Sequence, residues 1–136
     1  MNAIVGQKVS IVTDKPQTTR GRIRGVLTTD HSQIVFTDTP GFHKPRTLLG
    51  KRLNRMVEET TGERADAVVL VVDAAAGVGR GDAFVADRQV VPARGRKVCA
   101  VNKIDLLRGD AVLPQLEAVS GLADFDEIVP VSAKTG

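Results

Sequence analysis

The first part of the chain alternates between apolar and polar residues. Residues 22–29 and 32–38 place β-branched and apolar side chains at about every second position, and the turn-forming Asp30 separates them. This period is typical of strands with one buried face, so the two segments predict an antiparallel hairpin. A loop rich in Pro and Gly follows at 39–50, and apolar residues at helical spacing then predict a helix over 51–61.

The rest of the chain alternates short apolar runs with helical patterns. Three runs predict strands, at 67–73 (AVVLVVD), 97–102 (KVCAVN) and 127–131 (EIVPV). Helices are expected between them, at 82–91, where Pro92 ends the helix, and at 111–119. The first two runs are almost continuously apolar, which predicts strands buried on both faces of a parallel sheet. This order of elements favours right-handed crossovers and a doubly wound α/β sandwich.

Length and composition fit a single globular domain. The chain has 136 residues, of which 42% are hydrophobic and 26% charged. Its longest apolar run, 67–72, is about a third of the roughly 20 residues that a membrane-spanning helix needs. The N-terminus lacks the basic region and apolar stretch of a secretion signal. We therefore expect a cytoplasmic protein without an integral membrane segment.

The composition excludes several classes of site. The net charge of +3 permits an anionic partner without identifying one. Four Phe without Tyr or Trp argue against modules that stack bases on an aromatic platform. Cys99 is the single cysteine, which excludes an internal disulfide and favours a small buried residue. His31 and His43 have no Cys or acidic residue at zinc-ligand spacing.

Polar clusters follow three of the predicted strands. They are Asp38-Thr39-Pro40-Gly41, Asn102-Lys103-Ile104-Asp105 and Ser132-Ala133-Lys134. Ligands of such sheets bind outside the carboxyl ends of the strands, so these clusters predict a binding site. A carboxylate there can hold a water of a bound magnesium ion, and a glycine lets a backbone N–H approach a phosphate oxygen.

The second cluster has the chemistry to recognise a purine. Asn102 and Asp105 can hydrogen-bond the edge of the base, and an ionised Asp, which only accepts, suits the paired N–H donors of guanine. The stem of Lys103 can lie flat against the ring.

These motifs resemble a known family. DTPG, NKID and SAK, in this order, are similar to the third, fourth and fifth motifs of the translation-factor class of GTPases. The stretch GQKVSIVTDKPQTTRGRIRG, followed by DTPGFHKPRTLLGKRLN, resembles the Era family of ribosome-assembly GTPases, in particular its actinobacterial form, over essentially the whole chain. The implied fold is a P-loop NTPase-like G domain, doubly wound, mostly parallel, with one antiparallel hairpin strand.

The resemblance implies a site for GTP and GDP. Thr19 matches the switch I threonine that ligates Mg²⁺ and senses the γ-phosphate, with Thr18 beside it. Asp38 matches the residue that holds Mg²⁺ through water, and Gly41 the N–H donor to the γ-phosphate. The same resemblance makes Thr19 and Gly41 the catalytic candidates, and the motif around Gly41 also contains Thr39 and Pro40.

The remaining motifs match the base site. Asn102, Lys103 and Asp105 match the guanine clamp. Ser132, Ala133 and Lys134 match the loop whose backbone contacts the guanine oxygen. Phe42 stands where other GTPases have a water-orienting glutamine, so hydrolysis needs another way to position water. In similar proteins a monovalent cation such as K⁺, held near switch I, supplies part of the missing charge.

The resemblance also implies partners, which are 16S rRNA, the small ribosomal subunit and a peripherally contacted membrane. Basic residues can contact rRNA phosphates, although such clusters are more often solvated surfaces. This basic set consists of Lys44, Arg46, Lys51, Arg52 and Arg55, with Arg20, Arg22 and Arg24 alternating along one strand face. Asp73 also ends a predicted strand, and there we expect a structural cap rather than a nucleotide contact.

The phosphate-binding motif GxxxxGK[ST] does not occur in the sequence. Residues 1–8 resemble the end of the helix that follows this loop, which predicts that 1–136 is a partial G domain truncated at both ends. The first strand, the P-loop, the final helix and the RNA-binding KH domain would be missing. Losing three phosphate contacts costs on the order of 5 kcal/mol, or more than about a thousandfold in affinity. We therefore expect weak or no GTP binding, and aggregation through unpaired strand edges.

Two functions remain open. The first is a GTPase of the Era type that acts in small-subunit assembly, and the alternative is a non-enzymatic remnant or interaction module of a G domain. Asp38 and Asp105, taken singly, are also explained as turn residues that end strands. A dinucleotide-dependent oxidoreductase is disfavoured because no GxGxxG lies between a strand and a helix.

Overall fold

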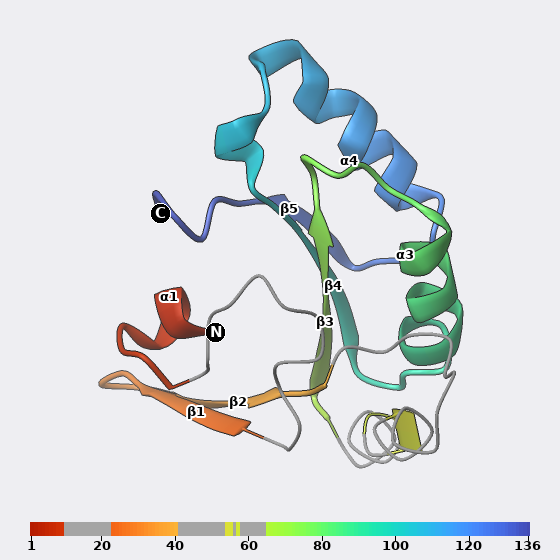
Figure 1. The fold of residues 1–136 in the computed structure, drawn as a ribbon. Helices are drawn as coiled ribbons and strands as arrows, with labels where there is room; N and C mark the ends of the chain where they lie inside the picture. The colour runs from red at the N-terminus through yellow and green to blue at the C-terminus, as the bar shows by residue number, and fades with distance from the viewer. Residues whose placement is uncertain (10–22, 41–53, 56, 58–64) are drawn as a thin grey trace. The chain divides into compact units, whose positions relative to one another are not determined.

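The computed structural model describes residues 1–9, 23–40, 54–55, 57 and 65–136. The chain divides into two compact units, a first unit at Met1–Thr60 and a second unit at Thr61–Gly136. Figure 1 shows the elements of each unit.

The first unit contains a short helix and the predicted hairpin. The helix α1 (Asn2–Val5) ends at Gly6, whose positive φ of 72° is the left-handed conformation that glycine adopts at helix C-termini. The strands β1 (Ile23–Thr28) and β2 (Gln33–Asp38) pair antiparallel. The turn between them is closed because the Thr29 N–H donates to the Ser32 carbonyl at 2.8 Å. The hairpin prediction is confirmed.

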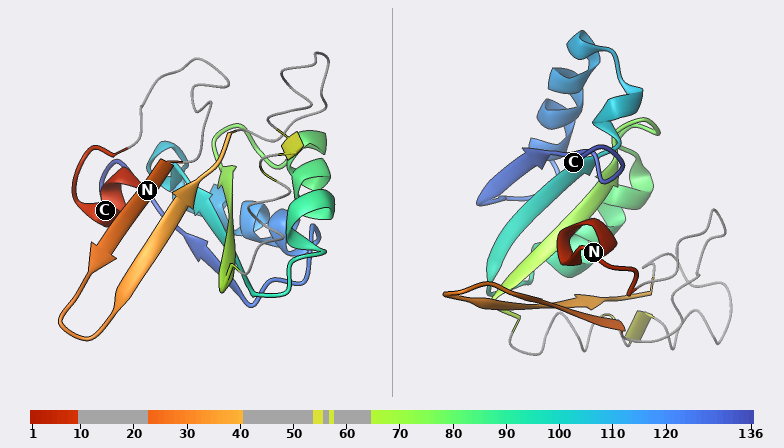
Figure 2. Two further views of the ribbon diagram at one scale, coloured as in Figure 1. Left: turned by 90° about the horizontal axis from the view of Figure 1, so that it is seen from below. Right: turned by 90° about the vertical axis from the view of Figure 1, so that its left-hand side faces the viewer.

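The second unit is an α/β layer built on a parallel sheet. The strands β3 (Ala67–Asp73), β4 (Arg96–Asn102) and β5 (Glu127–Pro130) lie in the order β3-β4-β5, and the two views of Figure 2 show them side by side. The crossovers are α3 (Arg80–Val85) with the π-helical turn η1 (Ala86–Val90), and α4 (Val112–Ser120). Two 3₁₀ turns, η2 (Ile104–Leu106) and η3 (Gly109–Ala111), precede α4.

The core of the second unit lies between the sheet and its helices. Buried side chains come from all of the layers, namely Leu70, Val72, Ala74, Ala86, Val90, Cys99, Val101 and Val119. Cys99 is fully buried, as its place in an apolar run predicted, and burial together with the negative charge of Asp82 raises the pKa of its thiol to about 11. The single cysteine is therefore part of the packing and is held as a neutral thiol.

The expectation that the first apolar strand is buried on both faces is wrong. Leu70 and Val72 point into the core, whereas Val69 and Val71, at alternating positions of β3, are 49% and 60% exposed. The physical reason is that α3, η1 and α4 all pack against the same face of the sheet, so the core lies on that face. The second run, β4, likewise buries Cys99 and Val101, while Val98 and Ala100 at the alternating positions are only half-buried.

The helix predicted over 82–91 begins two residues earlier, at Arg80. Asp82 is not the first helical residue but the third, in the first turn of α3, where its Oδ2 accepts the Gly79 N–H at 2.8 Å. The helical segment widens into η1, in which the Val91 N–H donates to the Ala86 carbonyl, and it ends before Pro92 as predicted. The helix expected over 51–61 falls mostly outside the described residues, of which 54, 55 and 57 are helical.

Within the part of the chain that the structure describes, none of the helices has the length and apolar character to span a membrane.

Candidate functional site

The parallel sheet brings the loops after β3, β4 and β5 to one edge. Asp73 at the end of β3 is the register partner of Asn102 at the end of β4, and Val101 is paired with Pro130 of β5. The Ala74 N–H donates to the Asn102 carbonyl at 2.9 Å, and the Ile104 N–H to the Val131 carbonyl at 3.3 Å. Backbone hydrogen bonds therefore fix the three loops against one another.

Asn102 ties its own loop to the loop after β5. Its side-chain Oδ1 accepts the backbone N–H of Ala133 at 3.0 Å. The Nδ2 group has no hydrogen-bond partner within the described residues, so its two N–H donors remain available. The amide thus acts as a brace with its oxygen and keeps a donor face for a ligand.

Asp105 and Ser132 form a second link between the same loops. The Ser132 hydroxyl, which is buried, donates to Asp105 Oδ1 at 2.7 Å and accepts the Thr135 N–H at 3.2 Å. Across the described part of the chain, Asp105 Oδ2 makes no hydrogen bond. One carboxylate oxygen is therefore fixed in direction by serine while the other is open to donors.

Lys103, which lies between Asn102 and Asp105 in the sequence, has an unusual backbone conformation. Its φ of 66° makes it the one non-glycine residue with positive φ in the described ranges. This left-handed conformation costs roughly 1–2 kcal/mol for a residue with a Cβ, and such strain concentrates at functional sites. Its Nζ donates to Asp73 Oδ2 at 2.6 Å, so the side chain is held at its far end as well.

Asp73 has a larger role than the sequence predicted. Its Oδ1 accepts the N–H groups of Ala75 and Ala76 at 3.0 and 3.3 Å, which confirms the expected cap. Its pairing with Lys103 was missed, although the parallel register of two strand ends was a usable signal. The hydrogen bond from Lys103 lowers the pKa of Asp73, burial opposes this, and the N–H groups of Ala76 and Ala75 lower it further.

This pair predicts a pH dependence with a definite sign. A carboxyl whose pKa is lowered by folding contributes stability above its ordinary pKa of 3.8, and that stability is lost as the pH falls through the lowered value. We expect Lys103→Met to raise the pKa of Asp73 towards 3.8, measured by carboxyl ¹³C titration in NMR. The pKa of Asp126, which is lowered by the Lys97 N–H and by Arg96 at the other end of the sheet, is the internal control. An unchanged pKa of Asp73 in this variant would contradict the assignment.

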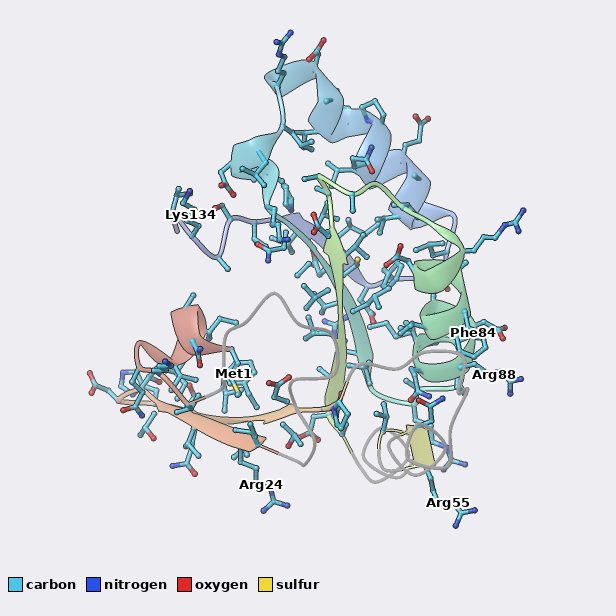
Figure 3. The ribbon with its side chains drawn as sticks, in the orientation of Figure 1. Met1, Arg24, Arg55, Phe84, Arg88 and Lys134 are labelled. Carbon is cyan, nitrogen blue, oxygen red and sulfur yellow. The ribbon has the colours of Figure 1, made fainter. Side chains whose placement is uncertain are left out.

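The remaining predicted site residues fall in two groups. Ala133 and Lys134 lie in the turn after β5, where both are exposed, and Figure 3 shows Lys134 on the side of the sheet edge away from α3 and α4. In the first unit, Asp38 is the last residue of β2, followed by half-buried Thr39 and buried Pro40. The predicted site residues Thr18, Thr19 and Gly41, and Phe42 beside them, lie outside the described residues.

The carboxylate of Asp38 has no hydrogen bond or ion pair to any other described residue. The described residues also contain no group of three or more His, Cys, Asp or Glu side chains that would hold a metal by themselves. A single carboxylate oxygen with water fits Mg²⁺, which usually keeps several waters and takes few protein ligands.

Comparison with known proteins gives this geometry a context. Residues 1–103 match the family model described as 50S ribosome-binding GTPase. GTPase Era of Leifsonia xyli subsp. xyli is 48% identical over 132 residues, which is 97% of this chain and 44% of that protein.

Two solved structures also match. One is Era in complex with MgGDPNP and nucleotides 1506–1542 of 16S ribosomal RNA, with a TM-score of 0.91, 32% identity, and coverage of 99% of this chain and 46% of that chain. The other is an Aquifex aeolicus Era variant bound to GDP and AlF₄⁻, with a TM-score of 0.89, 32% identity and the same coverage. The chain thus spans less than half the length of these relatives. It belongs to the 50S ribosome-binding GTPase family and is a relative of the Era proteins.

Proposed function

We propose that the sheet edge formed by Asn102, Asp105 and Ser132 binds the guanine base of GTP and GDP, as part of a GTPase of the Era type. The observation that carries this is the pair of loop-to-loop hydrogen bonds, Asn102 Oδ1 to the Ala133 N–H and the Ser132 hydroxyl to Asp105 Oδ1. They fix an open carboxylate oxygen and an open amide donor group at one edge.

The two open groups match guanine and not adenine. Guanine presents adjacent N–H donors to an ionised carboxylate, and acceptors at the other end of the same edge to an amide N–H. Adenine has a donor where guanine has its oxygen and lacks the paired donors. In the turn after Ser132, the N–H groups of Ala133, Thr135 and Gly136 already donate to Asn102 and Ser132, so the N–H of Lys134 supports the contact with the guanine oxygen.

Mg²⁺ is proposed as the metal that accompanies the nucleotide, held by Asp38 through water and by Thr19. Within the described residues the carboxylate of Asp38 has no hydrogen-bond partner, which supports this, and a related Era structure contains MgGDPNP. When bound, Mg²⁺ would neutralise charge on the phosphate oxygens during phosphoryl transfer. We also propose that Gly41 donates an N–H to the γ-phosphate. Because Phe42 cannot orient water, K⁺ is proposed to supply charge for hydrolysis.

The partners of the whole protein are proposed from its relatives. One related Era structure contains a segment of 16S ribosomal RNA, which supports 16S rRNA and the small ribosomal subunit as partners. Arg24 and Arg55 are the described members of the basic set, and both are exposed. A cytoplasmic location and a peripheral contact with membranes complete the proposal.

Residues 1–136 are proposed to form part of a G domain. The chain's coverage of less than half of the Era proteins supports this. Since the sequence has no GxxxxGK[ST], base contacts rather than phosphate contacts would dominate its binding. The 136-residue chain should therefore bind GDP and guanosine with similar and weak affinity.

The test is an NMR titration of the 136-residue chain with GDP, guanosine and ADP. We expect GDP and guanosine to shift the amide signals of Asn102, Asp105 and Ala133 with dissociation constants well above micromolar, and ADP to shift them only at much higher concentrations. Equal shifts with ADP would contradict a guanine site. No shifts with any of the three would favour the interaction module instead. Micromolar or tighter binding of a fluorescent GDP analogue would contradict the proposal that phosphate contacts are lacking.

A further inference from the structure

We propose that Asp73 is a positioning residue of the guanine site, which holds the side chain of Lys103 as a preformed support for the face of the base. This inference rests on the proposed function of the sheet edge. It concerns a residue at the end of β3, beside the two loops that supply the contacts to the edge of the base.

The first support is that Lys103 is held at both ends. At its backbone, the left-handed conformation is locked because the Lys103 carbonyl accepts the Leu106 N–H at 3.0 Å and the next N–H, from Ile104, donates to Val131. At its tip, the ammonium donates to Asp73 at 2.6 Å. The four methylene groups between these two anchors have little freedom left.

The second support is that Asp73 is itself rigid. Its Oδ1 is fixed by the N–H groups of Ala75 and Ala76, so that Oδ2 faces the end of β4. The backbone of the same turn is joined to β4, because the Ala74 N–H donates to the Asn102 carbonyl. An anchor fixed in this way can hold a long side chain in one direction.

The third support is that the pair remains accessible to a ligand. The side chain of Lys103 is 51% exposed and that of Asp73 is 38% exposed. A half-exposed row of methylene groups beside Asn102 and Asp105 can cover a flat ring. Holding it in place before binding removes part of the entropy cost that a free lysine would pay when the ligand arrives.

The test separates the anchor from the cap. In Asp73→Asn the side-chain oxygen can still accept the N–H groups of Ala75 and Ala76, but the NH₂ group that replaces Oδ2 cannot accept from an ammonium. We expect this variant to bind GDP about threefold to tenfold more weakly than the unmodified 136-residue chain, by NMR titration. A side chain that stacks on the face of the base makes no hydrogen bonds to its edge. The affinity of the variant for IDP should therefore fall by the same factor.

Two controls make the result specific. Asp126→Asn removes a comparable partner, since Asp126 Oδ1 accepts from Arg96 at 2.9 Å and Oδ2 from the Lys97 N–H at 2.8 Å, and it should leave GDP binding unchanged. In a Lys103→Met background, Asp73→Asn should have no further effect on the affinity for GDP. This double-mutant cycle reports whether Asp73 acts through Lys103.

Each outcome separates the two proposals. Wild-type affinity in Asp73→Asn, a loss of equal size in the Lys103→Met background, or a changed ratio of GDP to IDP affinity would each overturn the positioning role and leave the guanine site intact. Absence of GDP-induced shifts at Asn102 and Ala133 in the unmodified chain would instead overturn the guanine site, and the positioning role with it.

Discussion

Replacing Asp105 by Asn is expected to lower the preference of the chain for GDP over ADP by about 10- to 100-fold, which corresponds to about 1.4–2.8 kcal/mol. The amide retains one oxygen, which can still accept the Ser132 hydroxyl now bound to Oδ1. It replaces the open Oδ2 with an NH₂ donor, which would face the N–H donors of guanine. The preference is measured by parallel NMR titrations with GDP and ADP.

The same substitution has an expected gain and a matched control. Xanthine carries an oxygen where guanine has its amino group, so XDP should bind Asp105→Asn better than it binds the unmodified chain. Asp110→Asn, in the exposed turn η3 five residues further on, removes an equal charge and should leave every preference unchanged. An unchanged ratio of GDP to ADP affinity in Asp105→Asn would remove this residue from the base site.

Replacing Gly95 by Ala is expected to destabilise the second unit by about 2–3 kcal/mol. A Cβ at Gly95 would lie 2.5 Å from the carbonyl oxygens of both Ala65 and Asp66. These are backbone atoms just before β3, and the Asp66 carbonyl accepts the Arg96 N–H at 2.9 Å. The methyl group would therefore push apart the first residues of the β3–β4 pair. Urea unfolding, followed by circular dichroism, measures the change.

Gly81 provides a control with the opposite sign. It lies in α3, and a Cβ there would meet no heavy atom within 4 Å. Gly81→Ala should be neutral or stabilising by up to about 1 kcal/mol, because alanine loses less backbone entropy than glycine in a helix. If Gly95→Ala were as stable as the unmodified chain, the predicted clash of its methyl group with the backbone of Ala65 and Asp66 would be contradicted.

The elements that the sequence predicted well are those with strong local patterns. The β1–β2 hairpin follows a clear alternation with a turn at Asp30, and the end of η1 follows from the missing N–H of Pro92. The three parallel strands follow from apolar runs at regular spacing. The side chains of Asp105 and Ser132 meet, and that of Asn102 contacts the backbone of the loop after β5, because parallel strands end at one edge.

The features that the sequence did not predict depend on tertiary contacts. Whether an apolar strand such as β3 is covered on both faces depends on where its helices pack. The sequence of the strand alone does not determine the exposure of Val71. The first residue of α3 depends on whether Asp82 caps from inside the first turn. The ion pair between Asp73 and Lys103 joins residues thirty positions apart, and local patterns carry no information on it.

The buried thiol of Cys99 can serve as a probe of local unfolding in the second unit. It is fully enclosed and its pKa is about 11, so a thiol reagent near neutral pH meets neither an accessible nor an ionised sulfur while the helices cover the sheet. The rate of alkylation is then set by the fraction of molecules in which that layer has separated. The rate of alkylation of Cys99, in the middle of β4, thereby distinguishes a variant that has lost ligand affinity from one that has lost its fold.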